Sequence, residues 1–306
     1  MGCTTATNDL SVNLPMTLQN LLTPTDHNRN VSGMKYIYPV VSRRAGGVSV
    51  GVNLNINNAC NWRCIYCQVP NLTRGTPPPI ELDVLEHELR TLLTDVLHGD
   101  FMERYVAEVD RHLQDIAFSG NGEPTSAKEF SQVLHLVDKV LHDFGLLGDE
   151  LIANQVKPLK VRLITNGSLL DKPAILESMR HLAKCNGEVW FKVDAGTKEG
   201  IARINDVTLN PQSHIARLKR CAAVCPTFIQ TCMFELDGHV PSEPDIVAYL
   251  ALIDQVKADI QGVHLYGLAR PSFQAEADRL SRLSPEWLEA VAQRIRQHGI
   301  VVRVSP

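Results

Sequence analysis

The sequence predicts an α/β protein folded as a partial (β/α)6, TIM-like barrel. Strand-length apolar runs alternate six times with stretches of helical period between residues 48 and 296. Such alternation indicates parallel strands joined by right-handed crossovers. In addition, polar or glycine-containing turns follow several of the expected strands, and parallel α/β folds carry their active sites at these strand ends. We therefore expect one core domain over 34–306 with a C-terminal helix. Residues 1–33 form an N-terminal extension that either packs on this domain or stays mobile.

The expected elements follow in order along the chain. Strands are expected at 48–56, 115–120, 160–165, 188–194, 227–235 and 263–268, with a short closing strand at 300–304. Apolar residues at helical spacing predict helices at 82–96, 101–112, 130–141, 173–182, 211–222, 245–256 and 285–296. Ser126 and Glu129 have the spacing of a capping box ahead of the third helix. Ser284 and Pro285 are N-cap and first-turn signals for the last one.

Composition narrows the class of protein. The chain has 306 residues, a formal net charge of −4 and eight cysteines. This charge gives no reason to expect a nucleic-acid-binding surface. No apolar run has membrane-spanning length, so no membrane partner is expected. The first residues have neither the basic nor the apolar region of a secretory signal, and the cysteines then fit a reducing compartment. We expect a cytoplasmic protein.

Three cysteines form the most informative pattern. Cys60, Cys64 and Cys67 follow the first expected strand with C-x3-C-x2-C spacing, which puts three thiols on one loop. Thiolates hold iron–sulfur clusters, and this loop would supply three of the four ligands of a [4Fe–4S] cube. Zinc competes, but structural zinc takes four protein ligands, usually from paired cysteines. Disulfide pairing would leave one of the three thiols over.

The cysteine pattern, with Tyr66 before its last cysteine, resembles the signature of the radical S-adenosylmethionine (radical SAM) enzymes. The resemblance implies a partial barrel of the radical SAM type and a [4Fe–4S] cluster whose open iron is chelated by SAM. It also implies reductive cleavage of SAM to a 5′-deoxyadenosyl radical, with an external flavodoxin- or ferredoxin-like electron donor. The cofactors carry that chemistry, while the protein binds, orients and excludes water.

The resemblance also assigns residues to SAM. Tyr66 would lie near the adenine. Gly120-Asn121-Gly122-Glu123, after the second strand, stands where the family has a Gly-Gly-Glu turn, although Asn121 interrupts the glycine pair. Gly122 and Glu123 would therefore hold the methionine amino group. Asn166, after the third strand, would border the cofactor, although an Asn-Gly pair is also a common tight turn.

The fourth strand carries an unusual polar face. Strand alternation puts Trp190, Lys192 and Asp194 on one side. A lysine and an aspartate on an otherwise apolar strand are costly to bury unless they are paired or functional. A structural ion pair is one interpretation. The resemblance favours the other, in which Lys192 and Asp194 contact the SAM ribose or carboxylate.

Further residues are weaker candidates. Arg43 and Arg44 precede the first strand and could meet a substrate phosphate or carboxylate, or form ordinary surface ion pairs. The run from Tyr38 to Cys67 that contains them resembles an uncharacterised branch of radical SAM iron–sulfur oxidoreductases, related to enzymes of tRNA wyosine-base synthesis. Backbone groups near the end of the sixth strand would border the adenine. Free cysteine behaves as a small buried hydrophobe, which predicts core packing for Cys221, Cys225 and Cys232.

Two other functions stay open from the sequence alone. One is an iron–sulfur electron carrier or redox sensor that does not cleave SAM. The other is a zinc-stabilised binding module. If the protein is a radical SAM enzyme, its substrate is unknown, and a modified nucleoside, a tRNA, a peptide or a small metabolite would all be compatible with the sequence.

Overall fold

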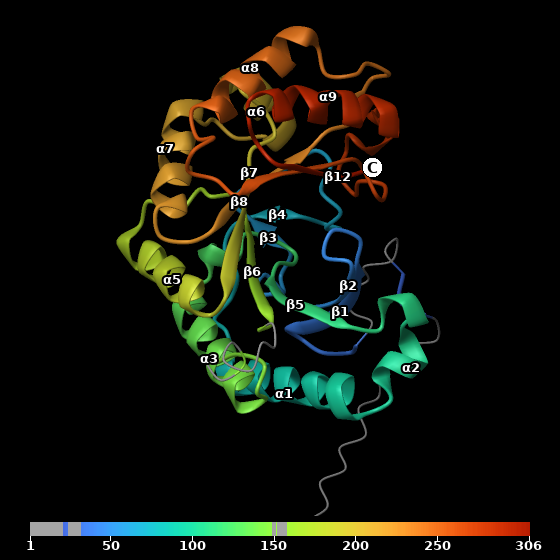
Figure 1. The fold of residues 1–306 in the computed structure, drawn as a ribbon, viewed down its shortest axis with the longest axis vertical. Coiled ribbons are helices and arrows are strands. Elements are labelled where there is room, and N and C mark those ends of the chain that lie inside the picture. Colours follow the sequence, from blue (N-terminus) through green and yellow to red (C-terminus); the bar gives the residue numbers. More distant parts are fainter. Residues whose placement is uncertain (1–20, 24–31, 149–150, 152–157) are drawn as a thin grey trace, which may run out of the picture.

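A single curled sheet of eight strands organises the molecule (Figure 1). The computed structural model describes residues 21–23, 32–148, 151 and 158–306. The strands lie in the sheet in chain order, and every neighbouring pair from β2 to β12 is parallel. They are β1 (Ile37–Ser42), β2 (Gly47–Val52), β5 (Leu113–Phe118), β6 (Lys160–Thr165), β7 (Gly187–Lys192), β8 (Thr227–Cys232), β10 (Gly262–Tyr266) and β12 (Val302–Ser305).

Helices cover the outer, convex side of this sheet (Figure 1). Apolar side chains of the helices and of the outer sheet face form one large core, as expected for a β/α barrel. The partial-barrel prediction is thereby confirmed. The helices are α1 (Leu82–His98), α2 (Phe101–Tyr105), α3 (Phe130–Asp143), α5 (Pro173–Lys184), α6 (Lys198–Asn205), α7 (Pro211–Ala222), α8 (Glu243–Asp254) and α9 (Pro285–Gln297).

The edge strand β1 was not predicted. It pairs antiparallel with β2 in a hairpin whose turn includes Gly46, at a φ of 78°. Pro39 lies within β1 and argues against a central strand, but an edge strand tolerates proline. The hairpin is also held by side-chain packing, because the Tyr38 ring lies directly over Gly51, where any Cβ would be 2.1 Å from it.

Two predicted helix features are wrong. The helix expected at 101–112 ends at Tyr105, because Val106 adopts extended backbone and no buried apolar face continues beyond it; Val109 is 82% exposed. The capping box does not form either. Ser126 instead closes a 3-10 turn over 124–126 and donates its hydroxyl to the Glu123 carbonyl at 2.6 Å. Helix α3 begins only at Phe130.

Strand ends and short elements also differ from expectation. β7 ends at Lys192, so Asp194 lies just beyond it in the loop. The short helix α6 was missed, since its eight residues give few turns of periodicity. Two small ladders, β3 (Ala59–Cys60) with β4 (Thr73–Arg74) and β9 (Glu235–Leu236) with β11 (Leu280–Ser281), brace loops at the strand ends.

The two edges of the open sheet are linked by side chains. Arg43, in the β1–β2 turn, donates to the backbone oxygens of Gly267 and Pro306, beyond β10 and β12. Most of the extension over 1–33 lies outside the described residues. Within it, Leu22 is buried and its amide donates to the Tyr105 carbonyl at 2.7 Å. Among the described helices, none is long and apolar enough to cross a membrane.

Candidate active site

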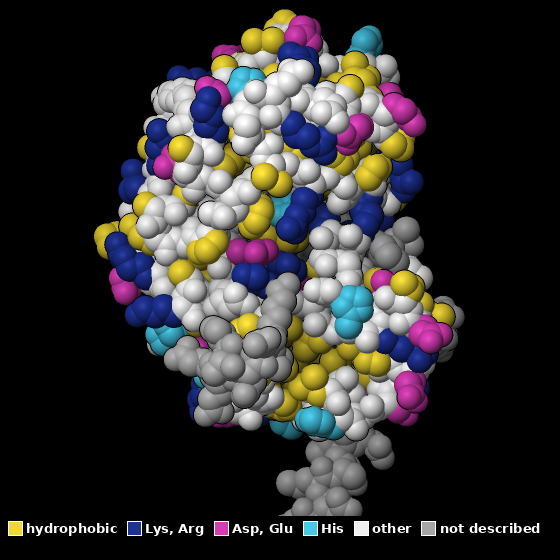
Figure 2. All heavy atoms as spheres, in the orientation of Figure 1, with side chains coloured by type: hydrophobic (Ala, Val, Ile, Leu, Met, Phe, Trp, Pro, Cys, Tyr) yellow, Lys and Arg dark blue, Asp and Glu magenta, His cyan; other side chains and the backbone are white. Residues whose placement is uncertain are grey.

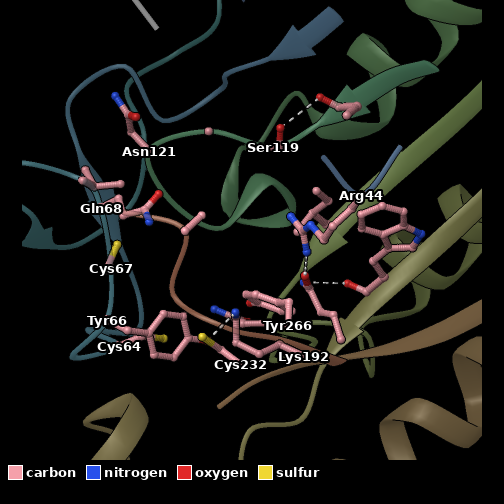
Figure 3. Close-up of a pocket in the computed structure, with 18 of the residues that line it drawn as sticks. Arg44, Cys64, Tyr66, Cys67, Gln68, Ser119, Asn121, Lys192, Cys232 and Tyr266 are labelled. Atoms are coloured by element: carbon pink, nitrogen blue, oxygen red, sulfur yellow. Dashed lines mark hydrogen bonds between the residues drawn. The ribbon is translucent and has the colours of Figure 1, made fainter. Parts of the chain in front are cut away.

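The cysteine loop and the ends of the parallel strands enclose one cavity of about 290 Å³. Figure 3 shows Cys64, Cys67 and Tyr66 on one side of it and Arg44 on the opposite side, with Lys192, Cys232 and Tyr266 between. Residues of the sheet strands β1, β2, β5, β6, β7, β8 and β10 contribute to the wall. The cavity therefore lies where a parallel barrel usually carries its chemistry.

The cysteine loop is held from outside the barrel. The Arg63 guanidinium binds both oxygens of Glu276, at 2.9 and 2.8 Å, and also donates to Asp206 at 2.8 Å. Ser272 donates its hydroxyl to the Ile65 carbonyl at 2.7 Å. The backbone amides of residues 63 and 65 bond the last carbonyls of α6. The loop is thus fixed by α6 and by the segment over 272–276.

All three loop thiols line the cavity, and two of them are in apolar surroundings. Burial raises the pKa of Cys60 to about 11 and that of Cys64 to about 12. The side-chain amide of Asn205 lies 3.2 Å from the Cys64 sulfur and favours its thiolate. In this environment the Cys60 and Cys64 thiols are neutral unless a cation compensates the charge of their thiolates, which is the usual situation of a metal-binding cysteine.

The separation of the thiols distinguishes between metals. Zn–S bonds of about 2.3 Å place the sulfurs of one tetrahedral zinc roughly 3.8 Å apart. Among the described residues, three donor atoms within 4.8 Å of one another occur at Asp138, His181 and Cys185, and not in the cysteine loop. As placed, the three loop sulfurs therefore do not all lie within 4.8 Å of one another, and they are not gathered as the ligands of one ion would be. A larger, multi-iron group would accept this wider arrangement.

The turn after β5 packs against the cysteine loop through glycine. A Cβ on Gly122 would lie 2.1 Å from the Ala59 carbonyl oxygen, directly before Cys60. Gly120 has a φ of 147°, and the neighbouring Asn121 amide donates to Asn53 at 3.0 Å. Gly122 thus allows the turn to approach the cysteine loop, and Gly120 allows it to approach Asn53, whose side-chain oxygen would lie 2.3 Å from a Cβ there.

Glu123 lines the cavity, yet its carboxylate is engaged by the protein. One oxygen accepts from the Thr125 amide (3.2 Å), the Thr125 hydroxyl (2.6 Å) and the Thr165 hydroxyl (2.6 Å). The other accepts from the Asn166 amide at 2.7 Å. Burial raises its pKa, while these hydrogen bonds oppose the shift. The carboxylate therefore ties the end of β5 to the end of β6.

Asn166 continues this connection to the cysteine loop. Its side-chain amide donates to Asn61 at 2.8 Å, and its side-chain oxygen accepts from the Ser168 amide at 3.0 Å. Asn61 in turn donates to the Ser168 hydroxyl at 2.7 Å. Asn166 thus positions the loop residue next to Cys60. The role of Asn61 was missed, since an isolated polar residue in a loop gives no sequence signal.

Lys192, Tyr66 and Asp194 form one buried chain. The Lys192 ammonium donates to the Tyr66 hydroxyl at 2.7 Å, and that hydroxyl donates to Asp194 at 2.6 Å. Asp194 also accepts from the Asn205 side chain at 2.7 Å and from the Cys232 amide at 3.0 Å. Burial lowers the pKa of Lys192, but attraction from Tyr266 and Asp194 outweighs it and keeps the amine charged. The strand alternation correctly predicted that Lys192 and Asp194 lie together, but nothing in the sequence indicated Asn205.

Arg44 projects into the far side of the cavity (Figure 3). Its guanidinium lies 4.9 Å from the Trp190 ring centroid and 4.7 Å from that of Tyr266. It donates to the Gln230 side-chain oxygen at 3.0 Å. Among the described residues, no carboxylate forms a salt bridge with Arg44. The guanidinium is held by aromatic faces and one amide, and its charge is not compensated by an acid.

Deeper in the barrel the charges are paired. Arg162 bonds Glu188 at 2.7 Å and also bonds Asp115. Asp115 accepts from Ser49, and Glu188 accepts from the Trp190 indole at 3.0 Å. The sequence analysis missed this network, although charged residues near the starts of three apolar strands are its signal. Arg162 is neutralised here, in contrast to Arg44.

The remaining cysteines separate into two groups. Cys221 and Cys225 are buried in the large apolar core, as predicted. Cys232 is also buried, but it belongs to a smaller apolar cluster with Cys64 and Tyr66 and lines the cavity. The core-packing prediction is therefore incomplete for Cys232.

Comparison with known sequences gives weak matches. No protein-family model matches the chain. It is 27% identical over 137 residues to a GTPase Obg of Brachyspira hyodysenteriae, which is 44% of this chain and 16% of that protein. It is 24% identical over 168 residues to a UPF0026 protein of Helicobacter pylori, which is 55% of this chain and 44% of that protein. The matches thus span less than half of each curated relative.

Comparison with solved structures shows which fold this protein shares. A radical SAM methyltransferase from Sphaerobacter thermophilus superposes with a TM-score of 0.53 and 15% identity, over 84% of this chain and 66% of that one. SuiB of Streptococcus suis gives 0.53 and 14%, over 86% and 50%. An anSMEcpe structure with bound AdoMet gives 0.51 and 18%, over 83% and 63%.

The cavity and curled sheet define an α/β partial barrel with a thiol-lined site at its strand ends. More particularly, the chain has the partial-barrel fold found in radical SAM enzymes.

Proposed function

We propose that this protein is a radical SAM enzyme. Cys60, Cys64 and Cys67 would hold a [4Fe–4S] cluster, and SAM would bind beside it in the cavity. Three thiols of one loop that line the same cavity carry the proposal, because thiolates hold iron–sulfur clusters, whereas structural zinc takes four protein ligands. The fold supports it, since the site lies at the strand ends of a barrel shared with known radical SAM enzymes.

Together the bound cluster and SAM would supply a 5′-deoxyadenosyl radical that abstracts hydrogen from the substrate. The chain's own residues bind and orient. Gly122 would leave room for the methionine amino group, and Glu123 would hold the strand ends around it. Asn166 would border the cofactor by fixing Asn61 beside Cys60. This division fits cofactor enzymes in general, where the protein supplies position and electrostatics.

The buried chain would fix the opposite side of SAM. Lys192 carries a positive charge into the cavity wall and would face the SAM carboxylate or ribose. Tyr66 and Asp194 hold the lysine in place through their hydrogen bonds. This series of hydrogen bonds continues from Asp194 through Asn205 to the Cys64 sulfur. It would therefore also connect the SAM position to one thiol. The Tyr66 ring would then border the adenine.

Anaerobic reconstitution tests the proposal directly. The wild-type chain should take up about four iron and four sulfide per protein, the content of one such cluster. With dithionite and SAM it should release 5′-deoxyadenosine and methionine. A Cys60→Ala/Cys64→Ala/Cys67→Ala variant should do neither. Full cluster content without SAM cleavage would favour the electron carrier. Tightly bound zinc at the loop without iron would favour the binding module.

The uncompensated Arg44 indicates the substrate's charge. A cation without an acidic partner in a partly buried cavity is a ready site for a carboxylate or phosphate, and guanidinium binds both in bidentate fashion. Repulsion from Arg44 and Arg282 lowers the pKa of the adjacent Arg43, after the larger effect of burial, which marks the same region as positive. We infer an anionic substrate group at Arg44.

The size of the substrate stays open between a metabolite, a peptide and a modified nucleoside or tRNA. Figure 2 shows Lys and Arg side chains interspersed with acidic and neutral ones on the face drawn, where the described residues form no continuous basic track. RNA-binding surfaces usually have one. The electron donor would be a flavodoxin- or ferredoxin-like protein.

Metabolite and RNA-modification profiling of a deletion strain would identify the substrate. The strain should accumulate an anionic compound or lack one modified nucleoside, and wild-type protein should reverse the change. Complementation with Arg44→Met should fail, while Arg303→Met, which alters another arginine on the sheet, should succeed. A neutral or cationic accumulating compound would contradict the inferred charge, and it would leave the SAM cleavage assay unaffected.

A further inference from the structure

A second group of metal-ligating side chains lies outside the barrel, between α3 and α5. Asp138 comes from α3, and His181 and Cys185 come from α5 and its C-terminal end. Their donor atoms all lie within 4.8 Å of one another. His181 and Cys185 are four residues apart, a spacing that puts both side chains on one helix face. None of these residues lines the cavity described above.

Several polar atoms at this seam lack a good partner. The His181 Nε2 atom approaches Asp138 at 3.1 Å, but this contact lacks hydrogen-bond geometry. Within the described residues, Nε2 and the other Asp138 oxygen are enclosed and make no hydrogen bond; each has one ion-pair contact at 3.1 Å, to Asp138 and to His142. Leaving a buried polar group without a hydrogen bond is costly. Enclosed ligand atoms that lie close together but make no hydrogen bond leave their lone pairs available to a cation.

The remaining neighbours hold the group in place without satisfying it. The Cys185 thiol donates to the His181 carbonyl at 3.3 Å, within the same helix turn. The His135 ring stacks on the His181 ring with centroids 4.0 Å apart and planes 14° apart. His142 places Nδ1 3.1 Å from Asp138, although that nitrogen also bonds the Asp138 backbone oxygen at 2.9 Å. The stacked ring fixes the orientation of the His181 imidazole.

The donor set selects the ion. One thiol, one imidazole and one carboxylate suit Zn²⁺, whereas Mg²⁺ and Ca²⁺ prefer oxygen alone. Metal–ligand bonds of about 2.0–2.3 Å place the ligand atoms of a tetrahedral ion roughly 3.3–3.7 Å apart. The observed 3.1 Å between His181 and Asp138 is close to this edge length. Small side-chain movements would therefore admit the ion.

We propose that Asp138, His181 and Cys185 bind one Zn²⁺ ion, with water or His142 in the fourth position. The ion would join α3 to α5 and thereby brace the part of the barrel formed by β5, β6 and β7. This site does not depend on the proposed function, because it shares no residue with the cysteine loop.

Cobalt(II) provides a direct probe, because a cobalt–thiolate bond absorbs near the ultraviolet edge of the visible spectrum. The Cys60→Ala/Cys64→Ala/Cys67→Ala variant of the full chain removes the loop thiols, so that the remaining signal reports other cysteines. Titration with Co²⁺ should give a thiolate-to-cobalt band that saturates at one equivalent. Added Zn²⁺ should abolish the band, because zinc binds such sites more tightly.

Further substitutions assign the band. Cys185→Ser in the same background should remove it, and His181→Gln should weaken Co²⁺ binding at least tenfold. Cys221→Ser, at a buried core cysteine, is the matched control and should leave the band intact. If the triple variant does not fold, the same comparison is made in the wild-type background by zinc content after purification. Absence of stoichiometric binding, or an unchanged band in Cys185→Ser, would overturn the site.

A stability measurement separates binding from a merely structural role. Zn²⁺ should raise the melting temperature of the loop-cysteine variant and of its Cys221→Ser derivative. It should not raise that of the Cys185→Ser derivative. An equal increase in all three would show that zinc binds elsewhere, and the proposal would fail.

Discussion

The side-chain amide of Asn205 lies 3.2 Å from the Cys64 sulfur. The same nitrogen donates to Asp194 at 2.7 Å, and Asn205 is only 1% exposed. A donor to a ligating sulfur stabilises the thiolate and helps to set the potential of an iron–sulfur cluster. Asn205→Leu should therefore weaken retention of the proposed cluster by roughly 10- to 100-fold. Anaerobic iron loss to a chelator would measure this.

The same variant should make the cluster's reduction potential more negative, because a hydrogen bond to sulfur favours the reduced state. Gln293→Ala, at an exposed position on α9, serves as the control for handling and purity. Unchanged iron retention and potential in Asn205→Leu would mean that this contact does not act on the cluster.

The Arg63–Glu276 pair should make the anchorage of the cysteine loop dependent on pH. The hydrogen bond from Arg63 lowers the pKa of Glu276 from its ordinary value of 4.5. A carboxylate with a lowered folded pKa contributes stability above its unfolded pKa, and this contribution is lost as the pH falls through the folded value. Glu276→Gln should cost the apoprotein about 1 kcal/mol at neutral pH, given partial exposure of the pair.

Denaturant unfolding across pH would check this expectation. The difference in unfolding free energy between wild type and Glu276→Gln should be full at neutral pH and shrink as the pH falls below 4.5 and through the lowered pKa of Glu276. A difference that does not change with pH would show that the carboxylate's charge plays no part.

Gly122 offers a steric test of the approach between the β5 turn and the cysteine loop. An alanine Cβ would lie 2.1 Å from the Ala59 carbonyl oxygen and 2.7 Å from the Asn55 side chain. Gly122→Ala should therefore destabilise the protein by about 1–3 kcal/mol and displace Cys60. Thermal unfolding and iron uptake on reconstitution would both fall. At Gly267 the nearest atom is a flexible leucine methyl at 3.2 Å, so Gly267→Ala should take up iron normally.

Tyr66→Phe tests the buried chain without removing the ring. Loss of the hydroxyl leaves Lys192 without its acceptor and Asp194 without one donor, both in a desolvated place. We expect a loss of about 1–3 kcal/mol in unfolding free energy. The losses of Tyr66→Phe and Lys192→Met should be strongly non-additive in the double variant, because they break the same chain. If the two losses in unfolding free energy simply added in the double variant, Lys192 and Tyr66 would not act through a shared series of hydrogen bonds.

Much of the barrel could be predicted because its strands and helices carry strong apolar periodicity. Strand β1 was not predicted because Pro39 argues against a strand at that position. Helix α6 was not predicted because its eight residues show little helical periodicity. The end of α2 could not be read either, because the chain turns where Val106 becomes extended rather than at a proline or glycine.

The site was predictable to the extent that its residues cluster in sequence or follow strands. The three cysteines and the polar residues after β5, β6 and β7 were found in this way. Contacts between segments far apart in the chain were not, as Asn205 and Arg162 illustrate. The Arg44 guanidinium was found only as one of a basic pair, since its placement between Trp190 and Tyr266 depends on how the sheet curls.

The apolar residues around the cysteine loop form a small cluster that shares no member with the large core between sheet and helices. Burial of the large core supplies most of the driving force for folding. The barrel can thus form its main core without the contacts around the cysteine loop. If the proposed cluster is bound, the apoprotein should therefore already be folded before iron and sulfide are added.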